Sequence, residues 1–169
     1  SPWRPVFQVL PLALELLWEP LNATALFQFL SHPAGPIPTR VRNALAQTVA
    51  GTPGIGSAAW EEAIASALAQ EDEARRSAIE QDIRYWLESP RFPPLQGVDS
   101  QTLSRRAQKV ADWLQGARES REDPGWKSLY NIALNQAQEF VAATERLRAH
   151  ARDPLTQDNL RRLIEDVRG

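Results

Sequence analysis

The chain has 169 residues, contains neither cysteine nor methionine, and carries a formal net charge of -2 from 19 basic and 21 acidic side chains. The lack of cysteine excludes disulfides, thiol nucleophiles and thiolate metal sites. The slightly negative charge argues against a protein that coats nucleic acid non-specifically. No stretch approaches the roughly 18 uninterrupted apolar residues of a membrane span. We expect one domain over 1–169, excised from a larger protein because no initiating methionine is present.

Proline stops divide the first part of the chain into short helices. We expect a helix over 6–18, which ends before Pro20 because the residue that precedes a proline is pushed out of the α region. Asn22 is a polar cap for a second helix over 23–30. Pro33 closes this helix and opens a loop over 34–38.

Two further helices flank a glycine-rich loop over 52–56. We expect Thr39 to cap a helix over 40–50, and Gly51 to end it in a left-handed conformation. Ser57 is the predicted cap of the next helix. The apolar residues of that helix recur at four-residue spacing: Trp60, Ile64 and Leu68.

The second half of the chain is also helical. The charge run 70–76 either continues the preceding helix or turns a corner, and a further helix reaches about Leu87. The proline-rich segment 89–99 is the best candidate for an internal boundary. Beyond it we expect three helices: one capped by Asp99 or Ser100, one over 126–151, and one after Thr156. No window shows the alternation of a strand, so we predict an all-α fold, an irregular bundle of about seven helices.

The sequence offers no catalytic signature. It has no phosphate-binding P-loop and no nucleophile elbow. Its two histidines, His32 and His150, lie far apart, and each lacks a second ligand at the spacing that a metal needs. Adjacent carboxylates on a helix point in different directions, as on a solvated face. We therefore predict no catalytic residue, no metal site and no cofactor.

The loop over 52–56 is the first candidate for contact with DNA. Between two short helices, Gly54, Ile55 and Gly56 resemble the hairpin of a helix-hairpin-helix motif. In that motif glycines let backbone N–H groups approach a phosphate, and the helix that begins at Ser57 adds its positive dipole end. The alternative is a tight interhelical turn in which Ile55 fills the core.

A second candidate lies where the proline-rich turn 36–38 meets the next helix. Prolines lack the N–H donor, so phosphate binding there depends on the side chains of Arg40 and Arg42. The alternative is a stiff turn with two exposed arginines.

The densest basic cluster consists of Arg105, Arg106 and Lys109, with Trp113 four residues after Lys109. It is either a face that tracks phosphates beside a stacking aromatic ring or an ordinary solvated face.

The order of the motifs in the first third of the chain resembles a known family. Residues 21–26, 29–33 and 39–50 resemble the accessory 2B region of UvrD-type superfamily 1 helicases. The shared order is a capped helix, a hydrophobic pair, a proline, a turn and another helix. With the added stretches 18–21 and 53–56 and Trp60, the pattern resembles AddB/RexB-type subunits of helicase–nucleases. The stretches 110–114 and 162–167 are also similar.

This resemblance implies a non-catalytic helical accessory domain of a subunit that processes DNA double-strand breaks. The helicase motor and the nuclease would lie outside this fragment. The implied partners are the remainder of its own polypeptide, DNA and an AddA-type helicase subunit, in the bacterial cytoplasm. In the helicases, a Gly-Ile-Gly that meets the duplex backbone follows the first proline, whereas here that place holds residues 36–38. The alternative function is a helical protein-interaction module whose apolar grooves bind a partner helix.

Overall fold

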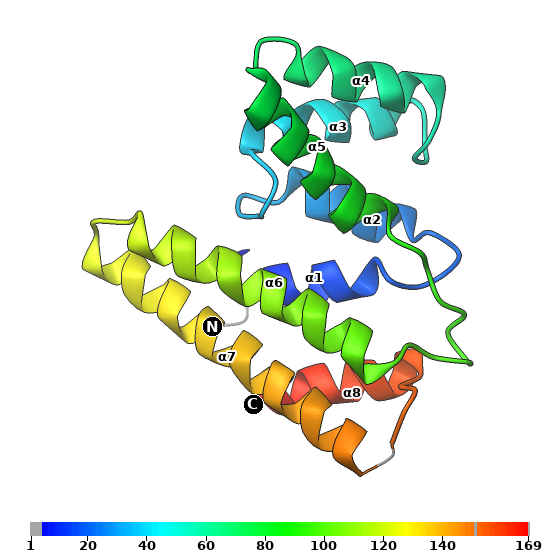
Figure 1. The fold of residues 1–169 in the computed structure, drawn as a ribbon, viewed down its shortest axis with the longest axis vertical. Coiled ribbons are helices and arrows are strands. Elements are labelled where there is room, and N and C mark those ends of the chain that lie inside the picture. The colour runs from blue at the N-terminus through cyan, green and yellow to red at the C-terminus, as the bar shows by residue number, and fades with distance from the viewer. Residues whose placement is uncertain (1–4, 151, 169) are drawn as a thin grey trace. The chain divides into compact units, whose positions relative to one another are not determined.

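The computed structural model describes residues 5–150 and 152–168, and this part of the chain is all-α, as predicted (Figure 1). Its elements are a short 3-10 helix and eight α-helices: η1 (Pro5–Gln8), α1 (Val9–Glu15), α2 (Ala23–Ser31), α3 (Thr39–Gly51), α4 (Ala58–Leu68), α5 (Glu73–Glu88), α6 (Ser100–Glu119), α7 (Pro124–Ala149) and α8 (Gln157–Arg168). One isolated antiparallel bridge links Val98 and Leu155.

The chain divides into two compact units. One unit is the continuous stretch Glu15–Arg91, and the other joins the residues before it to those after it. We call them the inserted unit (Glu15–Arg91) and the outer unit (the described residues among 1–14 and 92–169). The second change of unit falls between Arg91 and Phe92, inside the proline-rich segment.

The inserted unit contains α2 to α5, in which each helix packs against the next one along the chain. Side chains that precede the helices define their starts. Asn22 accepts a hydrogen bond from the amide of Ala25, and Asp72 accepts one from the amide of Arg75. The cap at Asp72 shows that the charge run 70–76 turns a corner. The apolar stripes meet in a core that contains Leu26, Leu30, Leu45, Trp60, Ile64, Leu68, Ile83 and Leu87.

The outer unit is organised around α6 and α7, which lie antiparallel and side by side (Figure 1). Asp99 caps α6 through the amide of Thr102, and Asp123 caps α7, which begins with a proline whose missing N–H is not needed there. α8 and η1 also pack against α7. The buried side chains include Leu103, Ala107, Val110, Leu114, Ala137, Phe140 and Leu160.

The segment that leads into α6 is held to the segment before α8. Val98 and Leu155 exchange two backbone hydrogen bonds of 2.8 and 2.9 Å. Next to this bridge, the carboxylate of Asp153 accepts hydrogen bonds from the amide and the hydroxyl of Ser100. The start of α6 and the start of α8 are therefore fixed relative to each other within the outer unit.

Several predicted helix ends are wrong, among them the start of α7, which is Pro124 and not 126. The first helix ends at Glu15, before the expected 18, because Leu16, Leu17 and Trp18 are all buried and three consecutive residues cannot share one face of a helix. Thr39 does not cap α3: the cap position is Pro38, which offers no side-chain hydrogen bond. Gly51 is the last residue of α3, and the positive φ angles lie further on, at Gly54 and Gly56.

Candidate nucleic-acid interface

The hairpin loop 52–57 joins two helices, α3 and α4, that pack against each other. Gly54 and Gly56 have φ angles of +99° and +80°, a region that L side chains rarely adopt. A Cβ atom at either position would meet nothing within 4 Å, so the backbone here faces open space. Ile55 is half-buried, so it packs only in part as the alternative interpretation proposed.

The backbone amides of this loop are available to an outside acceptor. Within the described part of the chain, the N–H groups of Gly54, Ile55, Gly56 and Ser57 donate no hydrogen bond. The loop ends at the first turn of α4, where the positive end of the helix dipole lies. Successive amides beside left-handed glycines form the kind of concave surface that binds anions in proteins.

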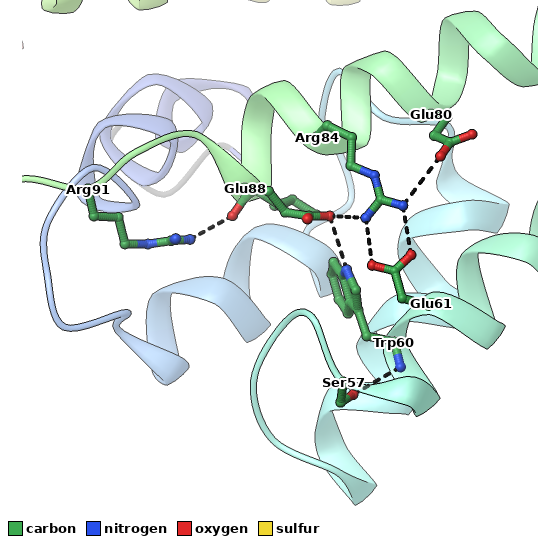
Figure 2. A network of polar contacts seen from close by, with 8 residues as sticks. Ser57, Trp60, Glu61, Glu80, Arg84, Glu88 and Arg91 are labelled. Atoms are coloured by element: carbon green, nitrogen blue, oxygen red, sulfur yellow. Dashed lines mark hydrogen bonds and ion pairs between the residues drawn. The ribbon is translucent and has the colours of Figure 1, made fainter.

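The start of α4 is anchored through both the backbone amide and the indole of Trp60, as Figure 2 shows. The hydroxyl of Ser57 accepts a hydrogen bond of 3.0 Å from the amide of Trp60. The indole of Trp60 is fully buried, and its Nε1–H donates to the carboxylate of Glu88 on α5 at 3.2 Å. The hairpin therefore leads into a helix whose first turn is held against α5.

Arg84 is the centre of the ion-pair network in Figure 2. Its guanidinium lies 2.7 Å from a carboxylate oxygen of Glu61, and it also pairs with Glu80 and Glu88 one turn away on either side. The hydrogen bond to Glu61 is the main reason why the pKa of Arg84 is raised. Because Glu61 lies in the first turn of α4, this pairing offsets a negative charge close to the hairpin.

We expect the Arg84–Glu61 pair to stabilise the chain at neutral pH and to lose this effect in acid. The hydrogen bond from Arg84 lowers the pKa of Glu61 below its ordinary value of 4.5, against the opposing effect of desolvation. A carboxyl with a depressed pKa contributes stability that is present above its unfolded pKa and is lost as the pH falls through the folded-state value. The thermal unfolding midpoint of Glu61→Gln should therefore lie slightly below that of the parent at neutral pH and coincide with it in strong acid. A difference that persists unchanged into strong acid would contradict this assignment.

Arg40 and Arg42 lie at the far end of α3 from the hairpin loop. The rise of 1.5 Å per residue places Arg40 about 16 Å along the helix axis from its last residue, Gly51. Arg40 is exposed, but its guanidinium donates to the carbonyl of Ala67 and pairs with Glu71 at 2.9 Å. It therefore braces the end of α4, and the structure does not bring it together with Gly54 and Gly56.

Arg42 is buried, with 2% of its surface exposed, so the expectation of two exposed arginines is wrong. Its guanidinium donates to the carbonyl of Ile37 at 2.7 Å, to the carbonyl of His32, and to the hydroxyl of Thr39 at 3.1 Å. These acceptors belong to the turn that leads from α2 into α3. Arg42 thus shapes this turn and is not accessible to a DNA phosphate.

The basic cluster on α6 is split by the helix. Arg105 and Lys109 are on the exposed side, whereas Arg106 has 2% of its surface exposed and donates to the carbonyl of Ala13 on α1 at 2.7 Å. The guanidinium of Arg106 is therefore an internal brace of the outer unit. Trp113 is half-buried and packs edge-on against Tyr130, with ring centroids 6.1 Å apart, so it is partly withdrawn as a stacking surface.

Sequence reasoning missed two groups of side chains. Glu80, Arg84 and Glu88 lie four residues apart, and this spacing predicts ion pairs along one face of a helix. Arg148, on α7, lines the same hollow as Arg105 on α6, and no local motif indicates that these two residues share a site.

No known protein family, curated protein or solved structure matches the chain. In the ranges 5–150 and 152–168, no three acidic or histidine side chains gather as a group that could hold a metal ion. None of the helices described is both long enough and apolar enough to cross a membrane.

Proposed function

We propose that this chain is a non-catalytic helical accessory domain of an AddB/RexB-type helicase–nuclease subunit, and that its hairpin loop contacts the DNA backbone. The proposal joins the order of motifs in the first third of the sequence to the geometry of the loop between α3 and α4. In this role the domain would support the rest of its polypeptide and an AddA-type helicase partner during the processing of double-strand breaks in the bacterial cytoplasm.

The main support for DNA contact is that the backbone N–H groups from Gly54 to Ser57 donate no hydrogen bond within the described residues. Both glycines turn the backbone outward, and nothing lies within 4 Å of the position that a side chain would occupy. A phosphate oxygen can therefore approach the N–H groups directly, and the N-terminus of α4 favours its negative charge. Backbone donors read no base, so such contact would be independent of DNA sequence.

The loop has no lysine or arginine of its own, so we expect its affinity for DNA to be low. Contact through amides alone would be weak, and its salt dependence would be small because neutral N–H groups do not neutralise phosphate charge and so release few counterions. Glu61, the nearest acidic residue of α4, is paired with Arg84 and so repels a phosphate less than a bare carboxylate would.

A pair of isosteric double variants tests the loop. Asparagine and aspartate have the same shape and both tolerate a positive φ, so Gly54→Asn with Gly56→Asn and Gly54→Asp with Gly56→Asp differ essentially in charge. We expect the aspartate variant to bind a labelled forked duplex about tenfold more weakly than the asparagine variant in low salt, because its carboxylates repel phosphate. Fluorescence anisotropy at several salt concentrations measures both affinities and their salt dependence.

Equal thermal unfolding midpoints would show that the two variants fold alike. If the asparagine and aspartate variants bind DNA equally, the loop does not contact phosphate. If the parent chain binds no forked duplex even in low salt, direct DNA contact is wrong as a whole.

The second candidate function is a helical protein-interaction module, and an apolar groove of about 370 Å³ in the inserted unit favours it. Side chains of α2, α3 and the hairpin loop line this groove, among them Leu26, Phe27, Val49 and Pro53. Phe27 keeps 45% of its surface exposed, so this groove offers apolar area to a partner. Absence of DNA binding in the assay above would favour this function over the first.

A further inference from the structure

A polar cleft lies between the first turns of α6 and the last turns of α7 in the outer unit, with a volume of about 200 Å³. The antiparallel pairing of the two helices brings these turns together, and residues three and four apart on each helix face the same side. The lining side chains include Gln101, Ser104, Arg105, Thr144, Glu145 and Arg148.

We propose that this cleft binds a phosphate group through the guanidinium groups of Arg105 and Arg148, one from each helix. The amide of Gln101 and the hydroxyl of Ser104 are further donors on the α6 side. Arginine suits this role because its planar fork of N–H groups matches two oxygens of a phosphate at once. The volume exceeds the roughly 30 Å³ that one water molecule occupies in the liquid, so a phosphate fits where several waters otherwise would.

The two arginines are available for such a ligand. Neither guanidinium donates a hydrogen bond or forms a contact ion pair with any of the described residues. By contrast, Arg106, the neighbour of Arg105 on α6, is buried, and its Nε–H donates a hydrogen bond to the backbone carbonyl of Ala13. The two cationic groups of the cleft therefore stand on separate helices, and a ligand need not displace a hydrogen bond or a contact ion pair to reach them.

Three carboxylates lie in or near the cleft, and two of them are already engaged. Asp153 accepts hydrogen bonds from Ser100, and Asp99 accepts them from Thr102. Although burial acts to raise the pKa of Asp99, the bonds from Thr102 and the charge of Arg105 outweigh it, so Asp99 remains ionised at neutral pH. Glu145 alone lines the cleft itself, and it makes the site weaker than two arginines would otherwise be.

This inference does not depend on the hairpin, which belongs to the other unit. A phosphate group reaches a protein either as a phosphodiester of nucleic acid or as a small phosphate ion or monoester. The guanidinium chemistry is the same for both sources, so the test uses inorganic phosphate and, separately, a DNA duplex with unphosphorylated ends.

The test uses a double variant that carries both Arg105→Met and Arg148→Met. The single variant Arg146→Met is its control. Arg146 is also an exposed arginine, two residues before Arg148 on α7, and it does not line the cleft. Backbone chemical shifts of the full chain are followed during titration with inorganic phosphate, and the duplex is titrated by fluorescence anisotropy. We expect the double variant to bind inorganic phosphate roughly tenfold or more weakly, and Arg146→Met to stay within about twofold of the parent.

A further variant, Glu145→Gln, should bind phosphate roughly threefold more tightly because it removes the one carboxylate that lines the site. Loss of affinity for both probes in the double variant would support the proposal with nucleic acid as the source. Loss for inorganic phosphate alone would support it with a small phosphate ligand. The proposal is overturned if the double variant binds both probes as the parent does, or if Arg146→Met weakens binding equally.

Discussion

Replacement of Arg42 by methionine is expected to lower the free energy of unfolding by about 3 kcal/mol, the scale reported for the loss of a buried charged donor. Arg42 is 2% exposed and donates to two backbone carbonyls and one hydroxyl in the turn between α2 and α3. Methionine fills much of the same volume but donates no hydrogen bond. The carbonyls of His32 and Ile37 would then be left without this donor.

The matched control is Arg40→Met, on the same helix two residues earlier. The side chain of Arg40 is 58% exposed, and its ion pair with Glu71 is screened by solvent, so we expect a loss below about 1 kcal/mol. Urea-induced unfolding followed by tryptophan fluorescence measures both variants, and amide exchange of α3 gives a readout specific to the inserted unit. Equal losses for the two variants would mean that burial of Arg42 does not stabilise this turn.

The burial of Arg42 and Arg106 was not predicted from the sequence. Arg42 lies three, four and seven residues before Leu45, Ala46 and Val49, so it belongs to the apolar stripe of α3. Arg106 lies three residues after Leu103 and four before Val110, so it belongs to the apolar stripe of α6. Helical spacing therefore indicated that both face inward, but their charge was interpreted as exposure. The burial follows from the stripe, whereas the carbonyl partners come from elsewhere in the chain and no local pattern identifies them.

Most local capping signals were interpreted correctly, with Thr39 and Gly51 as exceptions, whereas distant pairings were not predicted. The caps Asn22, Ser57 and Asp99 could be predicted because a cap and the amide that it accepts from lie three residues apart. The glycine loop between α3 and α4 was also visible as a loop, although its φ angles were not. The cleft shared by Arg105 and Arg148 could not be predicted, since it depends on how α6 and α7 align.

Gly97 is a second position whose role depends on distant residues, and Gly97→Ala is expected to lower the free energy of unfolding by about 3 kcal/mol. The φ angle of +88° alone disfavours alanine by about 1–2 kcal/mol. In addition, a Cβ atom would lie 2.5 Å from the carbonyl oxygen of Leu155, which is too close for any real contact. The backbone must then shift, at the overpacking cost of roughly 1–3 kcal/mol.

The structural consequence of this shift is local and can be measured separately. The same carbonyl of Leu155 accepts the hydrogen bond from the amide of Val98, so relief of the clash separates the bridge that ties the start of α6 to the start of α8. Amide exchange at Val98 and Leu155 should accelerate in Gly97→Ala. Urea-induced unfolding should show the loss in the free energy of unfolding.

Gly116→Ala is the matched control in the same unit, and it should act in the opposite direction. Gly116 lies within α6, is exposed, has no positive φ, and a Cβ atom there would meet nothing within 4 Å. Alanine at such a site restricts the unfolded chain without strain in the helix, so a gain of about 0.5–1 kcal/mol is expected. Opposite signs for the same chemical change would tie the cost at Gly97 to its backbone angle and to the carbonyl of Leu155. A similar small effect at both glycines would show that this bridge yields easily and does not fix the start of α6.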